Sequence, residues 1–145
     1  SESVASRLRK HGFVCRGIQI SVRDNSLFSF ERQCQLERPT ALSYDIFDSA
    51  MTLFKNNYDW ANPIRSFGVR AINLVGSDTA VQTSLFEDEE RRQKRERLDL
   101  AVEDIRMRFG HSSIRRAIIL QDHTLSGLNP SEHTIHPVGY FKPTN

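Results

Sequence analysis

The stretch GIQISVRDNSLFSFERQCQL, residues 17–36, decides how this chain folds. Its first half alternates, with Ile18, Ile20 and Val22 at one parity and polar residues between them. Because successive side chains of a strand point to opposite faces, the alternation predicts a strand with one buried face. The DNS sequence that follows is typical of a turn, so residues 13–36 are predicted to form a hairpin.

The second half of this hairpin alternates less cleanly. Arg32 shares its parity with the apolar residues Phe28, Phe30 and Leu36, which would place a guanidinium on the buried face. A bulge in the second strand is therefore one interpretation.

Two helices and a third strand are predicted around the hairpin. SESVASRLRKHG, residues 1–12, is typical of a short amphipathic helix that Gly12 stops. A second helix is predicted to begin with Ser43 as its cap and to reach about residue 56. Its inner stripe would consist of Ile46, Phe47, Ala50, Leu53 and Phe54. RSFGVRAINLV, residues 65–75, completes the set as a strand.

The order helix, strand, strand, helix, strand indicates an α+β fold. It is the split βαββαβ, ferredoxin-like arrangement without its first strand, in which two helices cover one face of a sheet. In that arrangement we expect the missing strand to leave a gap inside the sheet. The apolar segment SIRRAIIL, residues 113–120, is predicted to be a strand that fills the gap, and a strand exchanged with a second copy is the alternative.

The second half of the chain divides into three parts. Residues 77–86 are predicted to be a linker, and residues 87–109 a long helix ended by Gly110. Apolar residues form a stripe only in the second half of that helix: Leu98, Ala101, Val102, Ile105 and Phe109. With the strand at 113–120 and an irregular tail, the predicted domains are 1–76, 77–86 and 87–145.

Composition excludes several classes of protein. No stretch is typical of a signal peptide or is long and apolar enough to span a membrane, so we expect a cytoplasmic protein without a membrane partner. Cys15 and Cys34 show no metal-ligand spacing and are expected to be reduced thiols. His133 and His136 are spaced like a zinc pair, but no second pair of ligands accompanies them, so no metal site is predicted.

No constellation of catalytic residues stands out. The chain lacks a Gly-rich phosphate loop, a nucleophile elbow, and a serine or cysteine beside an obvious base. We therefore expect no catalysis and no cofactor. The exposed face of the predicted sheet is more informative, because its donors and guanidinium groups suit either phosphate binding or plain solvation. Residue types alone leave these two interpretations open.

Several segments together resemble the little finger of Y-family (translesion) DNA polymerases. They are VASRLRKHG at 4–12, Arg23 at the end of the first strand, Pro39-Thr40, and the run from Pro63-Ile64-Arg65 to Gly68-Val69. LDLAVEDIRMRFGHSSIRRAIIL, residues 98–120, is similar to an extension in some bacterial members, so the chain resembles the DNA polymerase IV and UV-repair (ImpB/MucB/SamB) group. The family's little finger normally begins with a strand, whereas this chain begins at the helix after it.

The segment QTSLF, residues 82–86, is similar to the bacterial sliding-clamp-binding pentapeptide. The resemblance implies that Gln82, Ser84, Leu85 and Phe86 bind the clamp, with the Leu and Phe entering an apolar pocket. In the family this motif usually lies close to the C-terminus, whereas nearly sixty residues follow it here.

The resemblance also implies a role for the sheet. In the family it lies along the major groove of template-primer duplex DNA and contacts phosphates. The residues that would do so here are Gln19, Ser21, Arg23, Arg32, Gln33, Arg65 and Arg70. The chain would thus be a non-catalytic part of a translesion polymerase, whose magnesium ions belong to a palm domain absent here. A protein-interaction adaptor that does not bind DNA is the main alternative, and a small ferredoxin-like enzyme without an identified site is the third.

Overall fold

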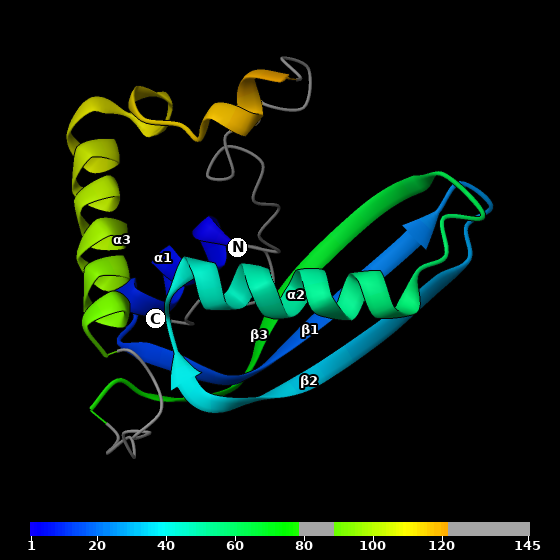
Figure 1. The fold of residues 1–145 in the computed structure, drawn as a ribbon, viewed down its shortest axis with the longest axis horizontal. Helices are drawn as coiled ribbons and strands as arrows, with labels where there is room; N and C mark the ends of the chain where they lie inside the picture. The colour runs from blue at the N-terminus through cyan, green and yellow to red at the C-terminus, as the bar shows by residue number, and fades with distance from the viewer. Residues whose placement is uncertain (79–88, 122–145) are drawn as a thin grey trace, which may run out of the picture. The chain divides into compact units, whose positions relative to one another are not determined.

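The computed structural model describes residues 1–78 and 89–121, except for the side chains of residues 119 and 120 (Figure 1). The chain separates into two compact units, Ser1–Leu100 and Ala101–Asn145. The elements are α1 (Glu2–Lys10), β1 (Phe13–Asp24), β2 (Ser29–Thr40), α2 (Ser43–Asn57), β3 (Ile64–Gly76), α3 (Glu89–Phe109) and the 3-10 helices η1 (His111–Ser113) and η2 (Ala117–Gln121). The predicted α+β fold, with its helix, strand, strand, helix, strand order, is confirmed.

Strand β1 is the centre of a three-stranded antiparallel sheet in the order β2-β1-β3. Its alternation has the predicted consequence, since Ile18, Ile20 and Val22 are at most 1% exposed. The hairpin of β1 and β2 is also confirmed. One face of β1 therefore supplies the middle of the core.

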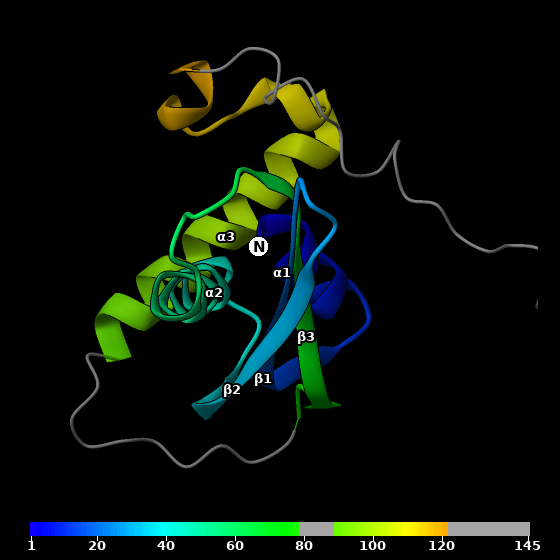
Figure 2. The ribbon, with the colours of Figure 1, turned by 90° about the vertical axis from the view of Figure 1, so that its right-hand side faces the viewer.

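Helices α1 and α2 cover this buried face, as the two views of the ribbon show (Figures 1 and 2). Helix α1 contributes Ala5 and Leu8, and Gly12, at φ +67°, follows its end as predicted. Helix α2 contributes Ile46, Ala50 and Phe54 to the core.

The predicted inner stripe of α2 is wrong at one position. Phe47 is 52% exposed, whereas Ile46, Ala50 and Phe54 are buried. Residues four apart lie on one face of a helix, and a neighbour in sequence is turned about 100° away from it. The stripe is therefore centred on Ile46, and Phe47 lies at its solvent side.

No bulge forms around Arg32. The β1–β2 register is regular from Gly17 to Arg23 and shifts only between Cys15 and Gly17. Arg32 pairs with Ile20 and so points to the helix-covered side, where its Nε donates to Asn57 Oδ1 at 3.1 Å. Its guanidinium also lies 5.2 Å from the centre of the Phe30 ring. Because β2 is an edge strand, the end of the Arg32 side chain can remain exposed there.

The expected gap inside the sheet is absent. Strand β3 pairs directly with β1 from Phe13↔Gly76 to Asp24↔Ile64, so both sides of the central strand are satisfied. A preceding strand, if the parent protein has one, could only join at an edge. Exchange of a strand with a second copy is not needed to complete the centre and stays a prediction.

The strand predicted at 113–120 is also wrong. Within residues 89–121 the chain forms the two short 3-10 helices after Gly110, whose φ of +91° ends α3. The guanidinium of Arg106 donates to the carbonyl oxygen of Ile114 from both Nε and Nη2 at 3.2 Å. An apolar segment forms a strand only where a neighbouring edge pairs with it, and none does so among the described residues.

The N-terminus of α2 is capped from elsewhere in the chain. Ser43 was predicted to be the cap, but it is the first helical residue and Leu42 precedes it in extended conformation. The Ser43 backbone N–H donates to Asp99 Oδ2 at 2.8 Å and its hydroxyl to Asp99 Oδ1 at 2.6 Å. Arg9 Nη1 of α1 lies 3.3 Å from Asp99 Oδ2. One carboxylate of α3 therefore connects all three helices.

The contacts of the first half of α3 with β2 and α2 are largely polar. Arg38 pairs with Glu89 at 3.4 Å, and Arg92 with Asp45 at 3.7 Å. The guanidinium of Arg95 lies 3.7 Å from the centre of the Tyr44 ring. In contrast, Leu98 and Phe109 of the predicted apolar stripe are 59% and 74% exposed.

Replacing Ile20 tests the role of the central strand. Ile20→Ala should lower the free energy of unfolding by about 2–5 kcal/mol, because it opens a cavity in the core. Ser21→Ala, on the exposed face of the same strand, should change it by no more than about 0.5 kcal/mol. Urea denaturation followed by circular dichroism measures both, and equal midpoints would contradict the assigned faces.

Replacing Asp99 tests the link between the helices. Asp99→Ala should cost about 1–3 kcal/mol, because the Ser43 N–H and hydroxyl lose their acceptor in a partly buried place. Amide hydrogen exchange in residues 89–100 should also become faster. Glu96→Ala, an exposed acid on the same helix, is the control. Exchange that is unchanged in Asp99→Ala would show that another contact holds α3.

Candidate nucleic-acid interface

The exposed face of the sheet is the candidate site. In an antiparallel sheet, directly paired residues point to the same side. Gln19 of β1 pairs with Gln33 on one side and Arg70 on the other, and Arg23 pairs with Ser29 and Ser66. Register therefore brings together Gln19, Ser21, Arg23, Gln33 and Arg70, five of the seven sheet residues named from the sequence.

Hydrogen bonds fix side chains across this face. Arg70 Nη1 donates to Gln19 Oε1 at 3.1 Å, and Gln19 Nε2 donates to Glu31 Oε2 at 3.0 Å. This chain of two bonds crosses all three strands and orients the Arg70 guanidinium. Glu31 also brings a negative charge into a face that carries two guanidinium groups, Arg23 and Arg70.

Gly68 pairs with Ser21 in the middle of the face and places no side chain beside it. A Cβ at this position would lie 2.4 Å from Ser21 Oγ, closer than such atoms approach each other. A side chain at residue 68 would therefore displace Ser21. The glycine leaves the serine hydroxyl open between the two arginines.

The turn beyond Arg23 is held by the next residue. The Asp24 carboxylate accepts bonds from the backbone N–H of Ser26 and Phe28 at 2.9 and 3.1 Å, and from the Ser26 hydroxyl at 2.7 Å. Asn62 Nδ2 donates to it at 3.1 Å, which ties the hairpin to the loop before β3. These bonds lower the pKa of Asp24 below its usual value, and the bond from the Ser26 hydroxyl has the largest effect. The carboxylate therefore stays ionised and keeps the end of β1 in place.

The remaining two predicted sheet residues are placed differently. Arg65 is exposed and lies at the irregularity where Arg23 pairs with Ser66 and Asp24 with Ile64. Arg32 lies on the helix-covered side, as described above. The structure therefore places Arg65 at the end of the face and does not bring Arg32 into it.

The predicted clamp-binding residues Gln82, Ser84, Leu85 and Phe86 lie outside the described residues. Within residues 1–78 and 89–121, no three His, Cys, Asp or Glu side chains are grouped to hold a metal ion. No helix of this described part has the length and apolarity that a bilayer crossing requires. The expectation of no metal stays a prediction, since His123, His133 and His136 are not described.

The thiols offer no reactive site in this region. Cys15 is fully buried in the core, and its burial raises the pKa of the thiol to about 11. It is therefore protonated at neutral pH, and a protonated thiol is a poor nucleophile. Cys34 is half-buried on β2.

The sequence alone missed two groups of residues. Glu31, Ser29 and Ser66 share the exposed face, and only the strand register shows this. Asp99 and Arg9 were not singled out, because nothing near them in sequence indicates that they meet at Ser43. An acid on a later helix can supply a cap, but local patterns do not show which acid does.

Comparison with known proteins shows which family this chain belongs to. Residues 1–85 match the family model of the impB/mucB/samB family C-terminal domain. The chain is 44% identical over 126 residues to a DNA polymerase IV of Acetivibrio thermocellus, which covers 87% of this chain and 32% of that protein.

Two further relatives carry the same name. A DNA polymerase IV of Desulfatibacillum aliphaticivorans is 30% identical over 84% of this chain and 31% of its own length. One of Clostridium acetobutylicum is 31% identical over 83% of this chain and 30% of its own length. The chain thus spans about a third of the curated relatives that it matches. It belongs to the impB/mucB/samB C-terminal domain family and is the little finger region of a Y-family DNA polymerase.

Proposed function

We propose that this chain holds duplex template-primer DNA for a translesion polymerase and tethers that polymerase to the sliding clamp. The observation that carries the proposal is the exposed sheet face, where register gathers Arg23, Arg70 and neutral hydrogen-bond donors from all three strands. Family membership supports the kind of ligand, since the relatives are named DNA polymerase IV.

The chemistry of the face suits phosphates rather than base edges. Guanidinium, hydroxyl and amide groups donate to phosphate oxygens, and such contacts position a protein on DNA without reading its sequence. Arg70 is already oriented by Gln19 and Arg23 lies beside a fixed turn, so little ordering is needed on binding. The Glu31 carboxylate keeps the attraction moderate, as a polymerase that must move along DNA requires.

The clamp tether is proposed on the sequence of residues 82–86. Leu85 and Phe86 would be the apolar anchors, and Gln82 and Ser84 the polar positions of the motif. A bacterial sliding clamp is the expected partner. Catalysis is assigned to the absent part of the parent polymerase, whose palm would hold the magnesium ions. This chain itself would be non-catalytic, and the parent protein would act in the cytoplasm.

An adaptor that binds proteins but not DNA is the second candidate. A sheet face on which Gln19 and Glu31 already satisfy each other is compatible with plain solvation. The two functions differ in their response to salt and to loss of charge on the sheet.

We expect weak, salt-sensitive binding of duplex DNA that is indifferent to sequence. In Arg23→Gln/Arg70→Gln, two phosphate contacts are lost, so the slope of log affinity against log salt should become less steep by about 1.8. Fluorescence anisotropy with two unrelated duplexes measures the affinity between about 50 and 200 mM salt. Over this range of salt concentration, the release of counterions changes the affinity strongly.

Arg32→Gln is the control for this measurement. It removes one guanidinium from the helix-covered side of the sheet and should leave the slope unchanged. Absence of duplex binding by the unaltered chain at the lowest salt would favour the adaptor.

Removal of the two apolar anchors tests the clamp tether. Leu85→Ala/Phe86→Ala should abolish measurable binding to a bacterial sliding clamp, because each anchor contributes about 1.5–3 kcal/mol on burial. Isothermal titration measures it, with Thr83→Ala, at a variable position of the motif, as the control. Duplex binding should be unaffected. Clamp affinity that equals that of the unaltered chain would refute the tether.

A further inference from the structure

Aromatic side chains gather at the end of the sheet where Arg23 closes β1 and Arg65 opens β3. There the turn between β1 and β2 and the loop between α2 and β3 lie side by side (Figure 1). The Asn25 backbone N–H donates to the Pro63 carbonyl oxygen at 3.0 Å, which joins the turn to the loop. The two segments therefore form one end of the compact unit.

Four aromatic rings at this end follow one another in space, and we call them the aromatic row: Phe28, Phe30, Tyr58 and Trp60. Their successive ring centres are 6.5, 6.2 and 5.6 Å apart. The two middle rings are half-buried, and Tyr58 also stacks on Phe54 of the core at 5.4 Å. The two end rings are different, because Phe28 is 65% exposed and Trp60 is 67% exposed.

Trp60 is held in place while most of its surface stays open. The rings of Phe54 and Tyr58 meet the indole at 85° and 69°, so neither ring lies flat against one of its faces. The φ of Trp60 is +62°, an uncommon backbone conformation for a bulky residue. Conformations of this kind are found chiefly at functional sites. The exposed indole is therefore a candidate for contact with a ligand.

Hydrogen bonds fix both segments that carry the exposed rings. The Phe28 backbone N–H donates to Asp24 Oδ1 at 3.1 Å, and Asn62 Nδ2 donates to Asp24 Oδ2 at 3.1 Å. The Tyr58 hydroxyl donates to the Asn62 carbonyl oxygen. A ligand that binds to the aromatic row would therefore have little of the protein to order.

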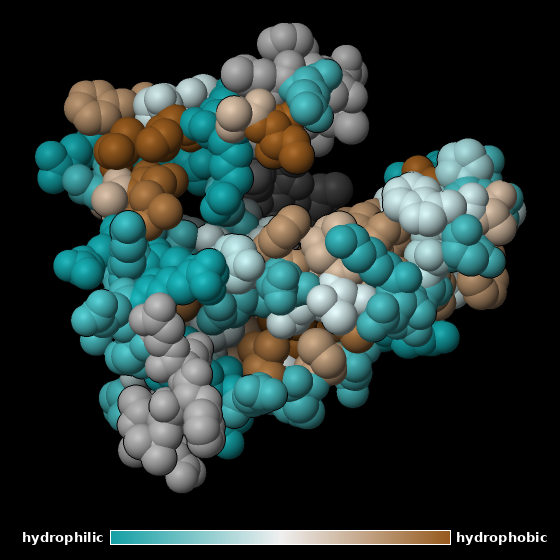
Figure 3. Space-filling model, viewed as in Figure 1, coloured by the Kyte–Doolittle hydropathy of each residue, from teal (hydrophilic) through white to brown (hydrophobic). Residues whose placement is uncertain are grey.

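Positive charge surrounds the aromatic row. The Arg32 guanidinium lies 5.2 Å from the centre of one of its rings, and Arg23 and Arg65 lie at the same end of the sheet. The carboxylates of Asp24 and Asp59 are also here, but both accept hydrogen bonds from backbone N–H groups. The surface at this end accordingly mixes brown and pale areas with teal (Figure 3). Rings beside cations suit single-stranded nucleic acid, whose bases stack while its phosphates meet the charges.

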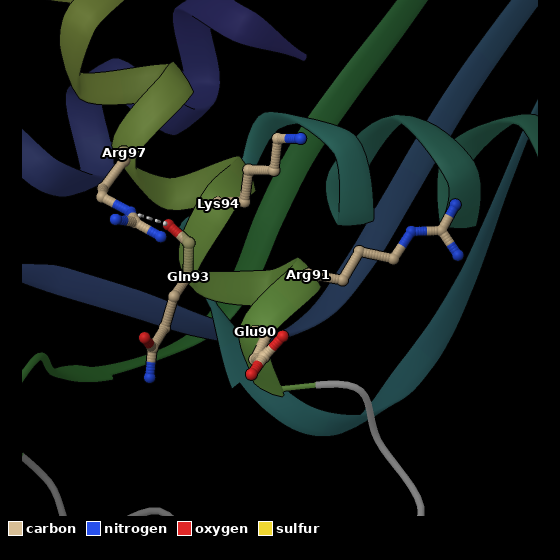
Figure 4. A pocket seen from close by; sticks show the side chains of 5 residues that line it. All are labelled: Glu90, Arg91, Gln93, Lys94 and Arg97. Carbon is tan, nitrogen blue, oxygen red and sulfur yellow. Dashed lines mark hydrogen bonds between the residues drawn. The ribbon is translucent and has the colours of Figure 1, made fainter.

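The open depression on α3 offers a different surface. It is lined by Glu90, Arg91, Gln93, Lys94 and Arg97 (Figure 4). These side chains carry charges of both signs and include no ring, so a base could not stack on an aromatic side chain there. The end of the sheet is therefore the better candidate for binding bases.

We propose that the aromatic row binds the unpaired template bases that adjoin the duplex, with Phe28 and Trp60 as the rings on which these bases stack. Template-primer DNA continues as a single strand beyond the end of the primer. The duplex on the open sheet face and the single strand at the end of the sheet would be successive parts of one ligand, and Arg23 and Arg65 lie where the two parts meet. This inference rests on the proposed function and adds a single-stranded subsite to it.

The single tryptophan of the chain makes a direct test possible, because intrinsic tryptophan fluorescence reports on Trp60 alone. The 145-residue chain is titrated at low salt with a blunt duplex and with the same duplex carrying a template overhang of about six nucleotides. The overhang should raise the affinity about fivefold or more, which is the gain expected from one stacked base, and should quench the fluorescence. An overhang of abasic nucleotides has the same phosphates and no bases, so it should do neither.

A variant without the exposed rings tests the same point from the side of the protein. Phe28→Leu/Trp60→Leu keeps apolar side chains at both positions, and it should lose the gain in affinity from the overhang while binding the blunt duplex as before. Phe47→Leu, at an exposed ring of α2 outside the aromatic row, is the matched control and should keep the gain. The fluorescence of the unaltered chain decides the question if the double variant does not fold.

The outcomes separate this subsite from the proposed function. Equal affinity for the blunt and the overhanging duplex, without quenching, would overturn the subsite, leave the proposed function intact and favour a protein partner for the exposed rings. A gain that the abasic overhang reproduces, or that Phe28→Leu/Trp60→Leu retains, would also overturn it. If neither DNA binds at the lowest salt concentration, the subsite and the proposed DNA binding both fail.

Discussion

Pairing of strand β1 on both sides is the constraint on which the rest of this structure depends. Each backbone group of a central strand must find a partner in a neighbouring strand, so β2 and β3 are fixed in register to it. A shift of one residue would turn Ile18, Ile20 and Val22 to solvent. The same register that buries these residues places Gln19, Ser21 and Arg23 on the open face. Core and candidate interface are therefore two sides of one alternation.

Asp99 has a comparable role for the helices. Its carboxylate satisfies the first turn of α2 and pairs with Arg9 of α1, so one residue of α3 holds three helices at a common point. A negative charge is favourable at a helix N-terminus, where unpaired N–H groups and the helix dipole meet. These contacts are polar. The first half of α3 therefore packs against α1 and α2 without an apolar stripe, since the apolar stripe of α3 lies in its second half. The segment that begins at residue 89 starts as part of the same compact unit.

The proposed DNA contacts of the sheet follow from charges that remain exposed once the fold has formed. On the sheet, Arg23 and Arg70 remain exposed after the core has formed. Weak contacts of this kind are screened by salt and carry no sequence preference. Under the proposed function, this suits a protein part whose contacts with DNA would change at every step of synthesis. Specific attachment would then come from the two apolar anchors of the clamp motif.

The sequence by itself determined the alternation of β1, the hairpin, both helices of the core and the ends at Gly12 and Gly110, because these depend on neighbours within a few residues. It also indicated most of the sheet face. Only the tertiary structure decided that β3 closes the sheet without a gap, that Arg32 belongs to the helix side, and that residues 113–120 form no strand but include parts of two 3-10 helices. Strand pairing decided all three, and pairing joins residues far apart in the chain. For the same reason Asp99, 56 residues after Ser43, could be recognised as its partner only in the folded protein.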